Sequence, residues 1–285
     1  MGEVRLVAFD LDGTLLDDRG RMSVASVEAL RRLKRAGIGM ASISGRNVGK
    51  SLAPFPPDIR PVLSVGSYNG AMVLGAGADN ERPLLREQRL PADGFLDLVD
   101  FVGNSGVNFI YCRCETDRTG LSEAYLTDEE TGWIRNLVRM TGVDIVLEPD
   151  LLARARDLVP PPKMILLPGP DRREDVFEKM RAAFGRQFYI ARTGDDRIEI
   201  MHPEVNKAVA LREICDARGV SLSQALAIGD GDNDLPMLAA AGIGVLMGNA
   251  DSLTRNSAAG AGLRTCEPLE DDGFSKTVAR YVPDC

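Results

Sequence analysis

Apolar and polar positions along the first part of the chain follow an alternation of strands and helices. A short apolar run at residues 4–9 stops at Asp10, which is typical of a buried parallel strand. Residues 23–37 then place apolar side chains at helical spacing, between a serine that can act as N-cap and a closing glycine. Apolar runs at 38–43 and 61–65 predict two more strands. This rhythm predicts a doubly wound parallel sheet.

The middle of the chain has a different pattern. Apolar side chains at helical spacing predict three helices, at about 95–102, 133–140 and 171–184. The last two of several strand-like runs are close enough in sequence to form a hairpin. We therefore expect a separate α+β unit with hairpin character. The strand-like runs are 107–112, 143–147, 164–167, 187–191 and 197–201.

The last part of the chain returns to the first pattern. It predicts helices at about 207–218 and 235–241 and strands at 225–229 and 243–247. The simplest architecture is an α/β fold in which a doubly wound, Rossmann-like parallel-sheet core is interrupted by an inserted α+β cap domain. We place the core at residues 1–81 and 203–285 and the cap at 82–202.

Charge and cysteine content narrow the range of partners and compartments. Lys and Arg total 34 and Asp and Glu total 42, so the net charge is −8. We expect neither nucleic-acid nor membrane binding, because an acidic chain lacks a broad basic face and no apolar run approaches the roughly 20 residues of a spanning helix. Five scattered cysteines and the lack of a visible secretory signal favour reduced thiols in a cytoplasmic protein. We interpret Cys112 and Cys114 as structural, since two thiols alone are too few for a metal site.

The strongest chemical signal is the segment DLDGTL at residues 10–15, which places Asp10 and Asp12 directly after the first predicted strand. Ligands of open parallel sheets bind beyond the carboxyl ends of the strands. Gly13 allows a sharp turn there, so we expect both carboxylates to project into that crevice. An isolated Asp-Gly pair is more often a surface turn after a core strand, so the interpretation depends on the segments described next.

A second acidic segment, GDGDND at residues 229–234, also follows a predicted strand. Its closely spaced carboxylates and amide are the oxygen ligands that a hard cation needs. An acidic turn that caps the next helix is the alternative, and the two roles are compatible.

Two weaker signals suit a phosphate group. Ser44, Gly45 and Arg46 follow the second predicted strand and offer a hydroxyl, a turn and a bidentate donor. Lys207 lies at the predicted start of a helix, where a lone lysine is usually a solvated residue. Neither signal indicates a phosphate site by itself.

Together these segments resemble the haloacid dehalogenase-like phosphohydrolase superfamily and, within it, the Cof-type group (class IIB). DLDGTL is similar to the first motif, SGR at 44–46 to the second, NK at 206–207 to the third and GDGDND to the fourth. NGA at 69–71 and MGNA at 247–250 resemble signatures of the Cof-type group. The chain departs from the pattern at Ala208, where the family usually has Gly. The resemblance covers nearly the whole chain and implies a large cap between the second and third motifs.

The resemblance implies a catalytic set of four residues. Asp10 would be the nucleophile that forms an aspartyl phosphate, and Asp12 the general acid and then the general base. Ser44 and Lys207 would hold the transferring phosphoryl group.

The resemblance also implies Mg²⁺ as the cofactor. The Asp10 carboxylate, the Asp12 backbone carbonyl and the Asp230 carboxylate would bind it, and Asp234 would orient this metal site. The residues that we expect to bind the substrate are Gly45, Arg46, Asn69 and Asn233.

The resulting prediction is an Mg²⁺-dependent phosphatase of a small phosphorylated metabolite, with a sugar phosphate as the first substrate class to consider. Two alternatives stay open: a phosphomutase such as a phosphomannomutase, and a non-catalytic module that binds a phosphorylated metabolite. A mutase needs a cluster of basic cap residues to grip a second phosphate. The sequence also leaves monomer and homodimer open. The basic cap residues, which do not form an evident cluster, are Arg113, Arg135, Arg139, Lys163 and Arg172.

Overall fold

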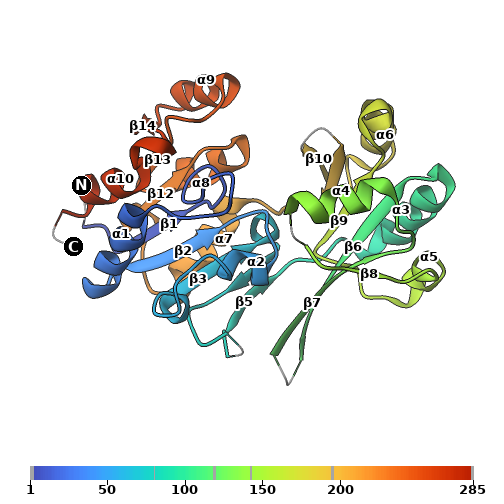
Figure 1. Cartoon of the computed structure of the whole chain (residues 1–285), viewed down its shortest axis with the longest axis horizontal. Coiled ribbons are helices and arrows are strands. Elements are labelled where there is room, and N and C mark those ends of the chain that lie inside the picture. Colours follow the sequence, from blue (N-terminus) through green and yellow to red (C-terminus); the bar gives the residue numbers. More distant parts are fainter. Residues whose placement is uncertain (1–2, 80, 118–119, 142, 194–195, 284–285) are drawn as a thin grey trace. The chain divides into compact units, whose positions relative to one another are not determined.

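The chain forms two compact units in a computed structural model that describes residues 3–79, 81–117, 120–141, 143–193 and 196–283 (Figure 1). The first unit is Met1–Glu87 with Asn206–Cys285, and the second is Gln88–Val205. The second unit begins six residues later than our expected start at residue 82. The reason is that β5 (Leu84–Glu87) pairs with β4 (Met72–Leu74) and so belongs to the sheet of the first unit.

The first unit is built on an eight-stranded sheet of order β14-β13-β12-β1-β2-β3-β4-β5. The six strands from β14 to β3 are parallel, and β4 and β5 add an antiparallel edge. The predicted fold class is therefore confirmed, with an antiparallel edge that the sequence pattern did not predict. The strands other than β4 and β5 are β1 (Leu6–Phe9), β2 (Gly39–Ile43), β3 (Leu63–Ser67), β12 (Ala225–Gly229), β13 (Ile243–Leu246) and β14 (Arg264–Thr265).

The central strands are buried along their whole length, as is typical of a parallel sheet with helices packed on it. Every residue of β1, β2, β3 and β12 is buried.

Among the described residues, no helix is long and apolar enough to cross a membrane. The helices of this unit are α1 (Val24–Arg35), α2 (Val48–Leu52), α7 (Lys207–Ala217), α8 (Leu235–Ala240), α9 (Ser252–Gly260) and α10 (Gly273–Tyr281).

The second unit has a six-stranded, mostly antiparallel sheet of order β10-β11-β9-β6-β7-β8. It has the α+β character with hairpins that the sequence predicts. Its strands are β6 (Asn108–Asp117), β7 (Gly120–Thr127), β8 (Ile145–Leu147), β9 (Lys163–Leu167), β10 (Tyr189–Thr193) and β11 (Arg197–Met201), and its helices are α3 (Ala92–Ser105), α4 (Gly132–Thr141), α5 (Leu151–Arg154) and α6 (Pro170–Phe184).

The two faces of this second sheet differ in chemistry. Phe109, Tyr111 and Ile200 share an apolar core with side chains of α3 and α6. The residues that alternate with them include a largely buried ion pair, in which Lys163 Nζ lies 3.0 Å from Glu199 Oε1. Among the described residues, the apolar core of the second unit is formed by side chains of that unit alone.

Cys112 and Cys114 lie on β6, are buried and are not oxidised to a disulfide. Burial raises the pKa of the Cys112 thiol to about 12, so the group stays neutral near pH 7. A neutral buried thiol behaves as a small apolar side chain.

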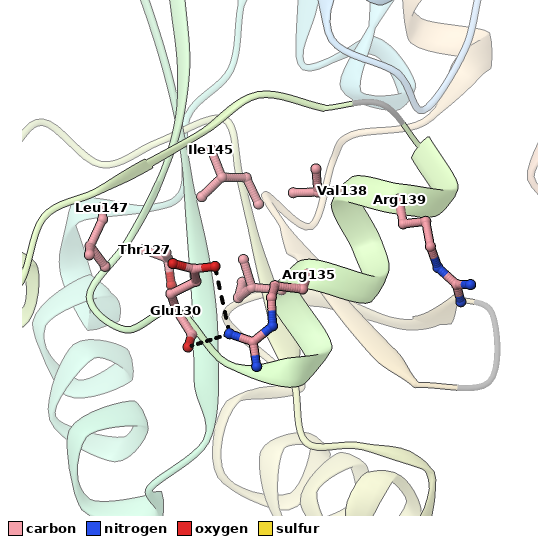
Figure 2. A pocket seen from close by; sticks show the side chains of 8 residues that line it. Thr127, Glu130, Arg135, Val138, Arg139, Ile145 and Leu147 are labelled. Atoms are coloured by element: carbon pink, nitrogen blue, oxygen red, sulfur yellow. Dashed lines mark hydrogen bonds and ion pairs between the residues drawn. The ribbon is translucent and has the colours of Figure 1, made fainter.

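A cavity of about 380 Å³ lies in the second unit, between α4 and the strands β7 and β8 (Figure 2). Its walls are apolar side chains, including Ile134 and Ile145, together with Arg135 and Arg139. Arg135 points to Glu130 across the rim, with 3.6 Å between Nη1 and Oε1. None of the site residues predicted from the sequence lines this cavity.

Candidate active site

The predicted site residues meet at the carboxyl ends of three neighbouring strands. Asp10 follows β1, Ser44 follows β2 and Asp230 follows β12, and β1 pairs in parallel with both of the other strands. The ladder continues one residue past β1, since the Asp10 backbone N–H donates to Ile228 O at 3.0 Å. Residues more than 200 positions apart in sequence therefore share one edge of the sheet, where open α/β sheets bind ligands.

Lys207 is the charge at the centre of this edge. Its Nζ donates to Asp10 Oδ1 at 2.7 Å and to Asp234 Oδ1 at 2.6 Å, and the side chain is buried. Asn206 caps α7 by accepting from the Val209 N–H at 3.1 Å, which fixes the helix turn that carries the lysine. The lysine is thus a buried partner of two carboxylates and not a solvated residue.

Asp10, Asp230 and Asp234 form a cluster in which one carboxylate oxygen from each lies within 4.8 Å of the others. Asp234 is fully engaged, because its Oδ2 accepts from the backbone N–H groups of Asp230 and Gly231 at 3.0 and 2.9 Å. Thr14 Oγ1 donates to Asp230 Oδ1 at 2.9 Å. Among the described residues, nothing donates to Oδ2 of Asp10 or of Asp230. Those two oxygens are available to a ligand.

The electrostatics of the cluster show an excess of negative charge. Burial raises the pKa of Asp10 to about 7, although Lys207 opposes this shift. Burial raises the pKa of Asp230 to about 6, with Thr14 acting in the opposite direction. Burial alone would lower the pKa of Lys207, but Asp10 and Asp234 outweigh it and the pKa is raised. One ammonium does not balance three carboxylates, so the cluster favours a bound cation.

Asp12 is separate from this cluster. Its side chain is 59% exposed, and both of its carboxylate oxygens accept hydrogen bonds from Arg46: Oδ2 from Nε at 2.8 Å, and Oδ1 from Nη2. The Arg46 backbone N–H in turn donates to Ser44 Oγ at 3.3 Å. Arg46, which we expected to bind the substrate, thus contacts the carboxylate of Asp12, a predicted catalytic residue.

Asn69 and Asn233 lie beside the loop that carries Ser44. The Asn69 N–H donates to Ser44 O at 2.9 Å, and Asn233 Nδ2 donates to Asn69 Oδ1 at 3.2 Å. Tyr68 and Asn69 both have positive φ, 50° and 57°, in the turn between β3 and β4. Two consecutive non-glycine residues in this region are strained, and such strain occurs where a site needs a fixed geometry.

Gly45 lies next to the Asn69 amide. A Cβ built on Gly45 would be in van der Waals contact with Asn69 Oδ1, at 3.4 Å. The structure therefore brings all four residues predicted to bind substrate to the same edge of the first unit.

Two residues that contact the site were not assigned a role from the sequence, Thr14 and Asn249. Thr14 orients Asp230, as described above. Asn249 Nδ2 donates to Gly13 O at 2.8 Å, and its Oδ1 accepts from the Leu269 N–H at 2.9 Å. The signal for both was present, since Thr14 belongs to DLDGTL and Asn249 to MGNA, but neither segment shows by itself which partner the side chain reaches.

Comparison with known proteins identifies the family. A model of the haloacid dehalogenase-like hydrolase family matches residues 7–276. The chain is 28% identical over 282 residues to the 5-amino-6-(5-phospho-D-ribitylamino)uracil phosphatase YitU of Bacillus subtilis, and the alignment covers 97% of both chains.

Solved structures share the fold over almost the full length. TM0651 from Thermotoga maritima superposes with a TM-score of 0.84 at 23% identity, over 97% of each chain. The subclass IIB sugar phosphatase BT4131 superposes with a TM-score of 0.73 at 19% identity, over 98% of this chain and 99% of the other. At these identities the likeness concerns the fold.

Proposed function

The chain belongs to the haloacid dehalogenase-like hydrolases, and on that premise we propose that it is an Mg²⁺-dependent phosphatase of a small phosphorylated metabolite. A full-length relative is a phosphatase, so the reaction class is the hydrolysis of a phosphoric monoester. The observation that carries the proposal is the buried cluster of Asp10, Asp230 and Asp234 around Lys207.

The residues present fit a divalent cation. Asp10 and Asp230 each offer a carboxylate oxygen that accepts no hydrogen bond from the described residues. Burial raises the pKa of both groups, and a bound cation would oppose that shift by favouring the ionised forms. These two carboxylates and the Asp12 backbone carbonyl would hold Mg²⁺, and Asp234 would orient Lys207 and the loop of Asp230. Bound Mg²⁺ supplies charge neutralisation for the anionic phosphate.

The chain's own residues account for two successive displacements at phosphorus. A carboxylate oxygen of Asp10 attacks phosphorus, and the bond to the leaving oxygen breaks as Asp12 gives that oxygen a proton. Water then attacks the phosphorus of the aspartyl phosphate, Asp12 takes the proton of the water, and inorganic phosphate leaves with Asp10 restored. Lys207, which touches Asp10, offsets the charge that gathers there, and Ser44 offers a hydroxyl to the phosphoryl oxygens.

A sugar phosphate or the phosphate of a related polyol is the substrate class we propose. The YitU phosphatase acts on a phosphorylated ribitylamino compound by its name, and BT4131 is a sugar phosphatase. The second unit, with its own sheet and core, would select the leaving group.

The phosphomutase alternative is not favoured by the basic residues of the second unit. Arg135 pairs with Glu130, Lys163 with Glu199, and Arg172 donates to Ser105 O at 2.9 Å. These partners are local, so these three cations do not converge on a common anion.

A phosphate-release screen over phosphorylated metabolites with Mg²⁺ tests the proposal. We expect phosphate release from a sugar or polyol monophosphate, loss of activity in EDTA and recovery on adding Mg²⁺. Full activity in EDTA would overturn the metal assignment. Interconversion of sugar phosphate isomers without phosphate release would favour the mutase, and no turnover of any phosphomonoester would contradict an enzymatic function.

A further inference from the structure

We propose that Arg46 is a positioning residue that holds the carboxylate of Asp12 and is not a ligand of the transferring phosphoryl group. The inference rests on the proposed function, since it concerns how Asp12 delivers and takes its proton. It revises the substrate-binding role that the sequence alone suggested for Arg46.

Arg46 and Asp12 form a bidentate ion pair. Nε and Nη2 of Arg46 each donate to a different oxygen of Asp12, with 2.8 Å between Nε and Oδ2. This two-point contact fixes the plane of the ionised carboxylate, the form that takes the proton of the water, and a single hydrogen bond would leave that plane free to rotate. When Asp12 carries the proton, the contact to the protonated oxygen is released and the contact to the other oxygen still holds the group. Because the Asp12 side chain is 59% exposed, little else restricts it.

Arg46 is itself held from several sides. Its Nη1 donates to Lys50 O in α2 at 3.4 Å, so each of the three guanidinium nitrogens already donates a hydrogen bond. Its carbonyl accepts from the Tyr68 N–H at 2.9 Å, and its N–H donates to Ser44 Oγ at 3.3 Å. Contacts with α2, the Ser44 loop and the strained turn at Tyr68 therefore hold Arg46 in place.

The charges of the site point the same way. Lys207 contacts Asp10 and Asp234, within the cluster where phosphoryl transfer would occur, and Arg46 contacts Asp12, outside that cluster. The two cations thus serve different carboxylates. A proton-transfer group is useful only when its oxygen lies within hydrogen-bond reach of the leaving atom, so restraint of an exposed carboxylate acts directly on the rate of that step.

A series of leaving groups separates positioning of Asp12 from binding of phosphate. A leaving oxygen of low pKa, as in 4-nitrophenyl phosphate, departs without a proton, whereas an alkyl oxygen needs one. We expect Arg46→Ala to lower kcat/KM by about 100-fold or more for an alkyl phosphate such as glycerol phosphate, and by about tenfold or less for 4-nitrophenyl phosphate. Arg46→Lys, which can make one of the two bonds, should give an intermediate loss for the alkyl ester.

An equal loss for all esters, together with weaker inhibition by inorganic phosphate, would overturn the inference and make Arg46 a phosphate ligand. A wild-type protein that hydrolyses no phosphomonoester would contradict the proposed function instead, so the two failures are distinguishable. Arg35→Ala is the matched control, because Arg35 forms an exposed ion pair with Glu28 in the same unit. We expect it to leave the whole series unchanged.

A double-mutant cycle gives an independent readout. If Arg46 acts through Asp12, then adding Arg46→Ala to Asp12→Asn should cost less than about twofold more on the alkyl ester. Additive losses would mean that the two residues act separately, and would overturn the inference. Circular dichroism of each variant checks that the fold is retained.

Discussion

Lys207 shows how strongly a single buried charge depends on its neighbours. An ammonium without partners would lose its proton or remain exposed, because burial penalises the charged form. Two carboxylates reverse that penalty, at 2.7 and 2.6 Å. The residue that was least informative in the sequence is therefore the one that connects three chain segments at the site.

Asp10→Asn tests the nucleophile with the smallest change in shape. The amide still fills the buried position but cannot attack phosphorus, so we expect Mg²⁺-dependent hydrolysis of 4-nitrophenyl phosphate to fall at least about a thousandfold. The far-UV circular dichroism should be unchanged. Activity close to that of wild type would remove Asp10 as the nucleophile.

The binding of Mg²⁺ should depend on pH, because the pKa values of Asp10 and Asp230 are raised to about 7 and about 6. A cation binds the ionised carboxylates, so below those values it must displace protons. We expect the apparent affinity for Mg²⁺ to rise between pH 5 and pH 8, by about tenfold per pH unit for each displaced proton. Titration calorimetry in two buffers of different ionisation enthalpy measures the affinity and the protons released.

The same raised pKa values predict that the free energy of unfolding falls as the pH rises. A carboxyl that binds its proton more tightly in the folded protein stabilises the fold fully below its unfolded pKa of 3.8, and this contribution is lost as the pH rises through about 6 to 7. Mg²⁺ should offset the loss at pH 8. An Mg²⁺ affinity that is the same at pH 5 and pH 8 would contradict the first expectation. Denaturant unfolding without Mg²⁺ checks the second, which a free energy of unfolding that does not fall between pH 5 and pH 8 would contradict.

At the scale of elements, the turn after β1 depends on one glycine. Gly13 has a φ of +77°, and a Cβ on it would overlap the carboxylate of Asp230. Asn249, from the loop after β13, fixes the same turn through the Gly13 carbonyl. Three loops therefore meet at a position where only a hydrogen fits.

Gly13→Ala should disturb the site more than the fold. The backbone strain costs about 1–3 kcal/mol of unfolding free energy, and the displaced Asp230 should lower activity by at least about tenfold. Gly20→Ala is the matched control, because Gly20 also has a positive φ, +71°, but a Cβ there meets nothing within 4 Å. We expect that variant to lose about 1 kcal/mol with activity retained. Denaturant unfolding and phosphatase assays measure both, and equal activity losses would contradict the argument.

The elements that position the site were the easiest to predict from sequence. β1 and β12 are continuous apolar runs that end at an aspartate, and both lie where the pattern indicates. β4 is only three residues long and β5 is partly exposed, so neither has a periodic signal. The pairing of β4 with β3 and of β5 with β4 is a tertiary effect. β7 mixes polar and apolar residues and was missed for the same reason.

The contacts within the site could not be predicted in this way. DLDGTL and GDGDND indicated which carboxylates to consider, because both follow buried strands. That Arg46 would hold Asp12, and that Lys207 would bridge Asp10 and Asp234, depends on side-chain directions that spacing does not determine. The sequence therefore predicted which residues lie at the site better than it predicted which of their side chains contact one another.

At the scale of the whole molecule, each unit carries its own apolar core. All predicted metal ligands belong to the first unit. The net charge of −8 consequently says little about the site, where Lys207 and Arg46 offset part of the local negative charge.

Mg²⁺ should stabilise the first unit selectively. A ligand at 100 times its dissociation constant adds about 2.7 kcal/mol to the stability of the state that binds it. We expect slower hydrogen exchange in the core strands of the first unit, including β1 and β12, and unchanged exchange at 88–205. Asp230→Asn should abolish the difference. An equal gain in protection across both units would contradict a metal site confined to the first.

The pairing of β1 with β12 also imposes an order on biosynthesis. The second unit is one continuous segment, Gln88–Val205, and can fold as soon as it has left the ribosome. β1 emerges early but must wait for Ala225–Gly229, its neighbour in the sheet, before its ladder is complete. β1 can pair with β2 early in synthesis, but its other edge stays open until Ala225–Gly229 has been made, so the site that joins Asp10 to Asp230 is completed only at the last stage of synthesis.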